Sequence, residues 1–117
     1  MNASRKTGTH PILGAFEPIE DLIYHDCPYV FTFRDAQGSL AIAYLADMHG
    51  KFSHYLAARI NENELADLKA GVLPLRRVFR VGGWDIRLDE NADIVSVKEK
   101  SADELDAKDL PAADFRI

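Results

Sequence analysis

The sequence predicts an α+β fold, with an antiparallel β-meander of about five to six strands on which one short helix and a helical turn pack. Three observations lead to it. Alternating apolar runs separated by short turns fill residues 28–59, a capped amphipathic segment follows, and two more alternating runs come after residue 83. Strands that follow one another through short turns pair as antiparallel neighbours, so one continuous sheet is expected.

The first two expected strands are marked with different clarity. Residues 21–24 are assigned to a strand, with a short helical turn as the alternative, and Pro28 ends the break that follows. Residues 29–34 alternate cleanly between two faces. The next four residues, Asp35 to Gly38, carry the chemistry of a type I turn closed by a glycine bulge.

The third expected strand, residues 40–45, is apolar on both faces, which is typical of a central strand covered on both sides. A turn containing Gly50 leads to the fourth strand, about residues 53–59. The meander carries one aromatic face, which we expect to be core under the helix. Its members are Tyr29, Phe31, Phe33, Tyr44 and Tyr55. If the helices cover too little of the sheet, apolar surface would remain for a partner or a second copy.

A helix is predicted over about residues 62–70. Asn61 stands at the N-cap with Glu64 three residues later, the spacing of a capping box, and Gly71 supplies the C-terminal stop. Pro74 then begins a segment with apolar residues at helical spacing, read as one or two helical turns that end at the glycine pair 82–83.

Two closing strands and a tail complete the chain. Trp84 opens an alternating run to residue 88, and a turn leads to a final strand beginning at Ile94. We therefore divide the chain into a flexible lead that docks at its end (residues 1–16), a single α+β domain (17–100) and an acidic tail that packs back (101–117). Leu110 and Phe115 are the expected anchors of the tail.

Composition excludes several classes of function. With 47% hydrophobic and 28% charged residues, the 117-residue chain is an ordinary globular protein. Residues 84–117 hold five basic and ten acidic residues, which accounts for the whole net charge of −5 and disfavours nucleic acid as a partner. We expect no membrane span and no secretory signal, and a single cysteine fits a reducing cytoplasm.

The order of elements resembles an uncharacterised family of small bacterial domains of unknown function. The residues that carry the resemblance are Tyr29–Phe33, Leu40–Asp47, Tyr55–Leu65, Leu75–Phe79, Trp84 and Leu110–Pro111. It spans about residues 17–112. The resemblance implies the fold and no catalytic residues.

One group of residues could form a metal site. Asp47 and His49 lie where a strand meets a turn, His54 follows on the next strand, and His25 and Asp26 precede the second strand. These side chains could converge on a metal ion, although the chain has no H-x-x-x-H or H-E-x-x-H spacing. Ordinary turn and edge-strand roles are the simpler interpretation. Glycine loops for phosphate are absent from the sequence, and we expect no cofactor.

Cys27 with His25 could in principle form a nucleophile and base. The proline that follows and the lack of an oxyanion-building loop favour a small buried thiol instead.

Arg76, Arg77 and Arg80 form the one compact basic feature, and with Trp84 they are the candidate partner-binding residues. The simpler interpretation is a solvated face that pairs in part with the acidic tail. The leading hypothesis is a non-enzymatic protein-interaction or self-associating module of a bacterial accessory, defence or immunity type, with another protein or a second copy in a homodimer as the expected partner. The alternative is a small metal-dependent hydrolase or ligand-binding domain that uses His25, Asp47, His49 and His54.

Overall fold

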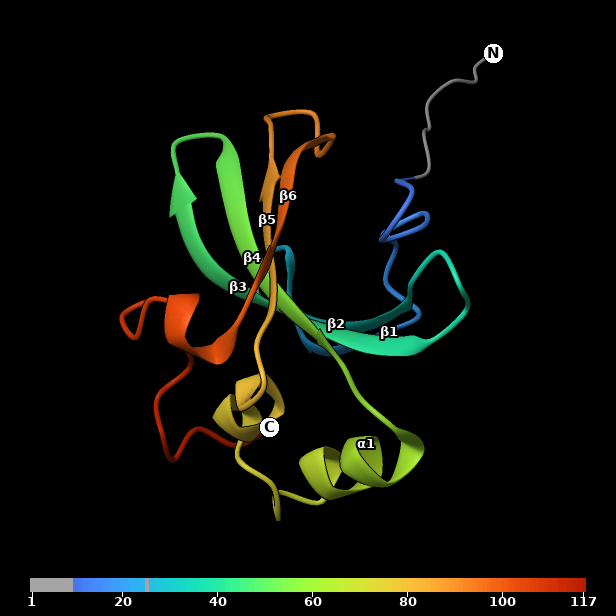
Figure 1. Ribbon diagram of the computed structural model, residues 1–117, viewed down its shortest axis with the longest axis vertical. Coiled ribbons are helices and arrows are strands. Elements are labelled where there is room, and N and C mark those ends of the chain that lie inside the picture. Colours follow the sequence, from blue (N-terminus) through green and yellow to red (C-terminus); the bar gives the residue numbers. More distant parts are fainter. Residues whose placement is uncertain (1–9, 25) are drawn as a thin grey trace.

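The computed structural model describes residues 10–24 and 26–117 and confirms the predicted fold class. A six-stranded antiparallel sheet is joined by one α-helix and two short 3₁₀ helices (Figure 1). The elements are β1 (Glu20–Tyr24), β2 (Pro28–Arg34), β3 (Leu40–His49), β4 (Phe52–Arg59), α1 (Glu62–Lys69), η2 (Leu75–Phe79), β5 (Gly83–Leu88), β6 (Ile94–Lys100) and η3 (Ala102–Glu104). No helix in this part of the chain is long and apolar enough to cross a membrane.

The strands pair strictly in chain order, from β1 to β6, which is the expected meander. Figure 1 shows a strongly twisted sheet, in which β3 and β4 extend from the β5–β6 hairpin to β1 and β2. Register shifts interrupt the β1–β2 pair, the β3–β4 pair and the β5–β6 pair. The two edge strands, β1 and β6, therefore both contain irregular pairing, which increases local twist.

Each face of the sheet carries its own apolar core, because strands β2 to β4 are apolar on both sides. The first core, here the N-side core, is covered by Leu13 and Phe16 from the segment before β1. It contains Phe31, Phe33, Ala41, Ala43, Leu45, Tyr55, Ala57, Trp84, Ile86 and Leu88. The second, the helix-side core, contains Val30, Ile42, Leu56, Ala58, Ile60, Leu68, Leu75, Val78, Phe79 and Leu105.

This arrangement corrects the prediction that the aromatic face lies under the helix. Phe31, Phe33 and Tyr55 lie in the N-side core, where Phe16 packs against all three rings at centroid distances of 5.0–5.9 Å. Tyr44 lies in the helix-side core. Alternation identified the two faces within each strand, but the β2–β3 register pairs Tyr44 with Val30, so the prediction that Tyr44 shares a face with Phe31 and Phe33 is wrong. The choice of cover depended on the path of a segment that contains few apolar residues.

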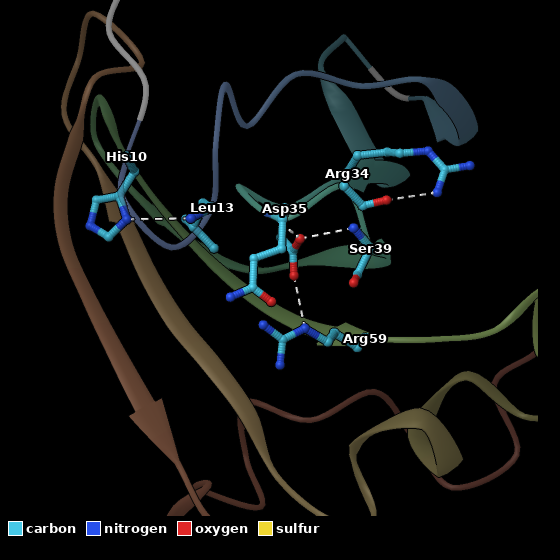
Figure 2. A network of polar contacts seen from close by, with 8 residues as sticks. His10, Leu13, Arg34, Asp35, Ser39 and Arg59 are labelled. Atoms are coloured by element: carbon cyan, nitrogen blue, oxygen red, sulfur yellow. Dashed lines mark hydrogen bonds and ion pairs between the residues drawn. The ribbon is translucent and has the colours of Figure 1, made fainter.

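The segment before β1 is tied to the β2–β3 turn by backbone contacts. His10 and Gly14 form an isolated bridge, and the Ala36 amide donates to the Ile12 carbonyl at 3.0 Å. The His10 Nδ1 atom accepts from the Ile12 and Leu13 amides, as Figure 2 shows for Leu13. This short hydrogen-bonded loop places Leu13, which is fully buried, in the N-side core.

Helix α1, η2 and the C-terminal tail together cover the other face. The predicted capping box of α1 is present, with Asn61 Oδ1 accepting from the Glu64 amide at 2.7 Å. The expected helical turn after Pro74 is the 3₁₀ helix η2. The tail packs back onto the helix-side core through Leu105, Leu110 and Phe115, and the Leu75 amide donates to the Phe115 carbonyl.

Candidate functional site

A hollow of about 170 Å³ opens at the end of the sheet where β4 leaves for α1 and β5 begins after η2. We call it the Arg59 hollow. Its lining residues are Ala58, Arg59, Val78, Val81, Gly82, Gly83, Trp84, Glu99 and Lys100. They come from β4, η2, β5, β6 and the link between η2 and β5, so the hollow is assembled from segments far apart in the sequence.

The two glycines of this hollow are required by close backbone approach. A Cβ atom on Gly83 would collide with the Ala57 carbonyl oxygen of β4, and one on Gly82 would collide with the Lys100 carbonyl oxygen of β6. Gly82 also has φ of +113°, a conformation that side chains with a Cβ rarely adopt. The glycine pair therefore brings the chain directly against the sheet and lets η2 form a wall of the hollow.

Arg59 is held at two points. Its Nε donates to Asp35 Oδ2 at 2.8 Å (Figure 2), and its guanidinium carbon lies 4.9 Å from the centre of the Trp84 ring. Its side chain nevertheless remains 52% exposed. In residues 10–24 and 26–117 the Nη groups of Arg59 have no hydrogen-bond partner, so Asp35 and Trp84 are the groups that orient the guanidinium in this part of the chain.

Asp35 is the buried anchor of this arrangement. Its carboxylate is fully buried and accepts from the Gln37 and Ser39 amides, both at 2.9 Å, as well as from Arg59. Burial by itself would raise the pKa of Asp35. The hydrogen bonds from Arg59, Ser39 and Gln37, together with the positive charge of Arg59, outweigh burial and hold the pKa below its ordinary value.

The rest of the lining includes two valines and two charged residues of β6. Val78 is buried, whereas Val81 is 81% exposed, the most exposed large hydrophobic residue of the described chain. Glu99 and Lys100 lie at the end of β6, where Glu99 pairs with Trp84 and Lys100 with Gly83, so their side chains lie on opposite faces of the sheet. The hollow therefore offers the oriented guanidinium of Arg59 and the exposed aliphatic side chain of Val81.

The structure separates the residues predicted to bind a partner. Trp84 is buried and lines the hollow beneath Arg59. Arg76 donates to the Pro111 carbonyl at 3.4 Å, and Arg80 forms an ion pair with Glu64 of α1 at 3.3 Å. Arg77 is exposed, and within the described chain its side chain forms no ion pair. The three arginines thus share a segment without forming one patch, and the expected pairing with carboxylates of the tail is not found in the described chain.

The residues of the predicted metal site fall into two pairs. His49 Nε2 lies 2.6 Å from Asp47 Oδ2 at an exposed hairpin end, whereas His54 is buried with its Nε2 3.0 Å from Asp85 Oδ1. No group of three or more metal-ligating side chains gathers among residues 10–24 and 26–117. His25 lies outside the described residues.

Cys27 is partly buried against the N-side core, where it packs as a small apolar side chain.

Sequence reasoning missed Arg59, Val81, Glu99 and Lys100. The glycine pair was read as the end of the helical turns, and nothing in the sequence showed which strands it approaches. Arg59 is the last residue of an alternating strand, and from the sequence it looks like a solvated end residue. Its partners Asp35 and Trp84 are 24 and 25 positions away along the chain. A long-range pair of this kind leaves no local pattern.

No family model, no curated protein and no solved structure matches this chain. The resemblance to a family of small bacterial domains stays a prediction.

Proposed function

We propose that this chain is a non-enzymatic protein-interaction module whose contact surface is centred on the Arg59 hollow. The observation that supports it best is the state of Arg59, which is fixed by Asp35 and Trp84 while its Nη groups have no hydrogen-bond partner among the described residues. Oriented arginines beside apolar surface are typical of protein interfaces, in which Arg and aromatic residues are enriched. The exposed Val81 supplies that apolar surface.

The groups in the hollow favour binding over catalysis. Among the described residues that line it, the titratable ones are an arginine, a lysine and a glutamate, and none is a serine, threonine, cysteine or histidine. Nucleophilic catalysis needs such a group beside a base, and acid–base work is usually done by a group that titrates near neutral pH. We accordingly place the module among accessory proteins that act by contact, in a bacterial cytoplasm.

A protein partner is favoured over pairing of two copies through the sheet edges. Glu20 and Asp21 lie on β1, and Lys98, Glu99 and Lys100 lie on β6. Charged residues and irregular pairing are devices that protect edge strands from pairing with another chain. A homodimer formed through another surface is an outcome that the experiment below detects.

Affinity capture from the source organism tests the proposal if two matched variants accompany the wild-type chain. Val81→Asp places a charge at the rim of the hollow, and Val95→Asp makes the same change on β6, where Val95 is 64% exposed. We expect a protein captured by the wild type and by Val95→Asp to be lost with Val81→Asp. Light scattering of the purified chain shows whether that protein is a second copy.

Two results would overturn the proposal. One is a partner that all three chains capture equally, because the contact surface would then lie elsewhere. The other is capture by none of them, together with a monomer at high concentration.

A further inference from the structure

We propose that His10 is a pH-sensitive latch: its neutral imidazole holds residues 10–16 on the N-side core, and its protonation releases them. The proposal concerns a different part of the molecule from the Arg59 hollow and does not depend on it. Three features of residues 10–16 lead to it: the acceptor role of the His10 ring, the apolar side chains that the loop secures, and the small number of other backbone contacts.

The His10 ring closes the loop as a hydrogen-bond acceptor. Its Nδ1 atom accepts from the Ile12 amide at 3.0 Å and from the Leu13 amide at 3.4 Å, the second of which Figure 2 shows. Both bonds need a lone pair on Nδ1, which a neutral imidazole has when its proton is on Nε2. A protonated imidazole carries a hydrogen on both nitrogens, so Nδ1–H would point at two amide N–H groups. Protonation therefore removes both hydrogen bonds.

Aspartate fills the same role elsewhere in this chain. Asp35, Asp89 and Asp106 each use Oδ1 to accept from the amide two residues later. A carboxyl group keeps an acceptor oxygen whether or not it is ionised, whereas Nδ1 of histidine loses its lone pair on protonation. Histidine is the side chain that ordinarily changes charge between about pH 5 and pH 8. Of these four turns, the one at His10 is therefore the one that mild acid can open.

The latch secures two apolar side chains. Leu13 is fully buried, and Phe16 packs against the rings of Phe31, Phe33 and Tyr55. Phe16 has φ of +46°, in the left-handed region that a residue with a Cβ adopts only at a cost in energy. Release of the segment would relieve this conformation and expose the aromatic surface beneath it.

Few other backbone hydrogen bonds hold residues 10–16. In the described chain they are two bonds between His10 and Gly14, both at 2.8 Å, and the bond from the Ala36 amide to the Ile12 carbonyl at 3.0 Å. The first two close the same loop as the His10 ring. Once the latch opens, a single backbone hydrogen bond in the described chain therefore joins this segment to the β2–β3 turn.

The charges near the segment give the protonated ring no partner. The charged side chains on the neighbouring elements are Glu17, Asp21, Arg34, Asp35, Arg59 and Glu99. The ion pairs that histidines form in the described chain do not include His10. Asp35 already accepts from Arg59, and because its pKa lies below the ordinary value of 3.8 it stays ionised at about pH 5. Mild acid therefore weakens the latch without changing the turn on which the segment rests.

Hydrogen exchange of two amides tests the latch in the full chain. The Gly14 amide donates to the His10 carbonyl and the Ala36 amide to the Ile12 carbonyl, so both report whether the segment is closed. Protection factors, which correct for the intrinsic effect of pH, are compared at about pH 7.5 and about pH 5. We expect both to fall roughly tenfold in the wild type, through loss of the two hydrogen bonds to the ring. Amides of the β3–β4 pair should keep their protection.

Three variants separate the latch from other effects of acid. His10→Asn keeps a side-chain acceptor for the same amides and does not titrate in this range, so its protection factors should be equal at both pH values. His10→Leu has no acceptor and should show low protection at both. His49→Asn replaces a histidine at the exposed hairpin end and should respond to pH as the wild type does.

The inference is overturned if Gly14 and Ala36 of the wild type are equally protected at both pH values. It is also overturned if His10→Asn either responds to pH as the wild type does or is as open as His10→Leu. Parallel loss of protection in β3 and β4 would show opening of the whole sheet instead of the segment. Nitrogen-15 shifts of the His10 ring give an independent check, because a proton on Nδ1 at about pH 7.5 would contradict its acceptor role.

Discussion

Asp35 shows how one residue connects stability with the candidate site. Its buried carboxylate closes the β2–β3 turn through two backbone amides and, through Arg59, fixes the side chain that forms the hollow. Because its pKa in the folded protein lies below the ordinary value of 3.8, the ionised form stabilises the fold. That contribution is present above pH 3.8 and is lost as the pH falls through the lower folded value.

Asp35→Asn is therefore expected to lower the free energy of unfolding at pH 7 by about 1–3 kcal/mol, through loss of the charged hydrogen bond to Arg59. The variant should also lose less stability than the wild type as the pH falls below the ordinary pKa of 3.8, because the folded pKa of Asp35 lies lower. Urea unfolding across this range measures both effects. Asp114→Asn, at an exposed tail position, is the control; parallel pH profiles of wild type and Asp35→Asn would contradict the assignment.

His54 and Asp85 form the other buried polar pair. Although the two atoms are 3.0 Å apart, the His54 Nε2 is buried without a well-aligned hydrogen bond, and Arg87 Nε approaches the same carboxylate oxygen at 3.5 Å. Deleting the acid leaves the buried imidazole without its neighbour, whereas replacing the imidazole removes the polar group itself.

Asp85→Ala should thus lower the free energy of unfolding by about 1–3 kcal/mol, and His54→Leu should lower it clearly less. Asp47→Ala, which breaks the exposed pair with His49, should change stability by at most about 1 kcal/mol. Chemical denaturation of the three variants checks the order. A larger loss for His54→Leu than for Asp85→Ala would show that the imidazole has a structural role beyond this pair.

At the scale of elements, local patterns in the sequence determined most of what could be predicted. The capping box at Asn61, the Asp35–Gly38 turn and the alternation of β2 depend on neighbours in the chain, and the structure contains all three. The cover of each sheet face and the assembly of the hollow depend on distant segments. For that reason Phe31, Phe33 and Tyr55 were assigned to the wrong cover. Arg59 was not recognised as part of a site.

The junction of η2 with the sheet gives a prediction at this scale. Gly83→Ala should destabilise the protein by roughly 3 kcal/mol, since the new methyl group collides with the Ala57 carbonyl of the paired strand. Gly71→Ala is the matched control: it has φ of +75° with open space around it, so only a backbone cost of about 1 kcal/mol is expected. Thermal unfolding distinguishes the two variants. Equal losses of stability would contradict the close approach of Gly83 to the Ala57 carbonyl.

For the whole molecule, the central claim about stability is that one sheet shared by two cores unfolds as a unit. Leu13→Ala in the N-side core should lower the free energy of unfolding by about 2–5 kcal/mol, although Leu13 lies outside the sheet. Ile12→Ala, at a position that is 41% exposed, should lower it by about 0.5 kcal/mol or less. Trp84 fluorescence and far-ultraviolet circular dichroism should report coincident transitions. A small effect of Leu13→Ala would show that residues 10–16 contribute little to the fold.

The two cores also explain where a contact surface can lie. Since both faces of the central strands are covered, the exposed large apolar side chains are found at the periphery of the sheet and in the links between elements. They are Ile12, Ile19, Tyr24, Met48, Phe52, Val72, Val81 and Val95. Val81 is the member of this set that lines the hollow.

The most direct test of the account is a chemical-shift map of the isotope-labelled chain with its captured partner, because it locates the contact residue by residue. We predict the largest changes at Gly82, Gly83, Trp84 and Lys100, with the Arg59 Nε–H among the shifted signals. Changes concentrated instead at Met48, Phe52 and Val95 would contradict the central claim that this molecule binds through the Arg59 hollow.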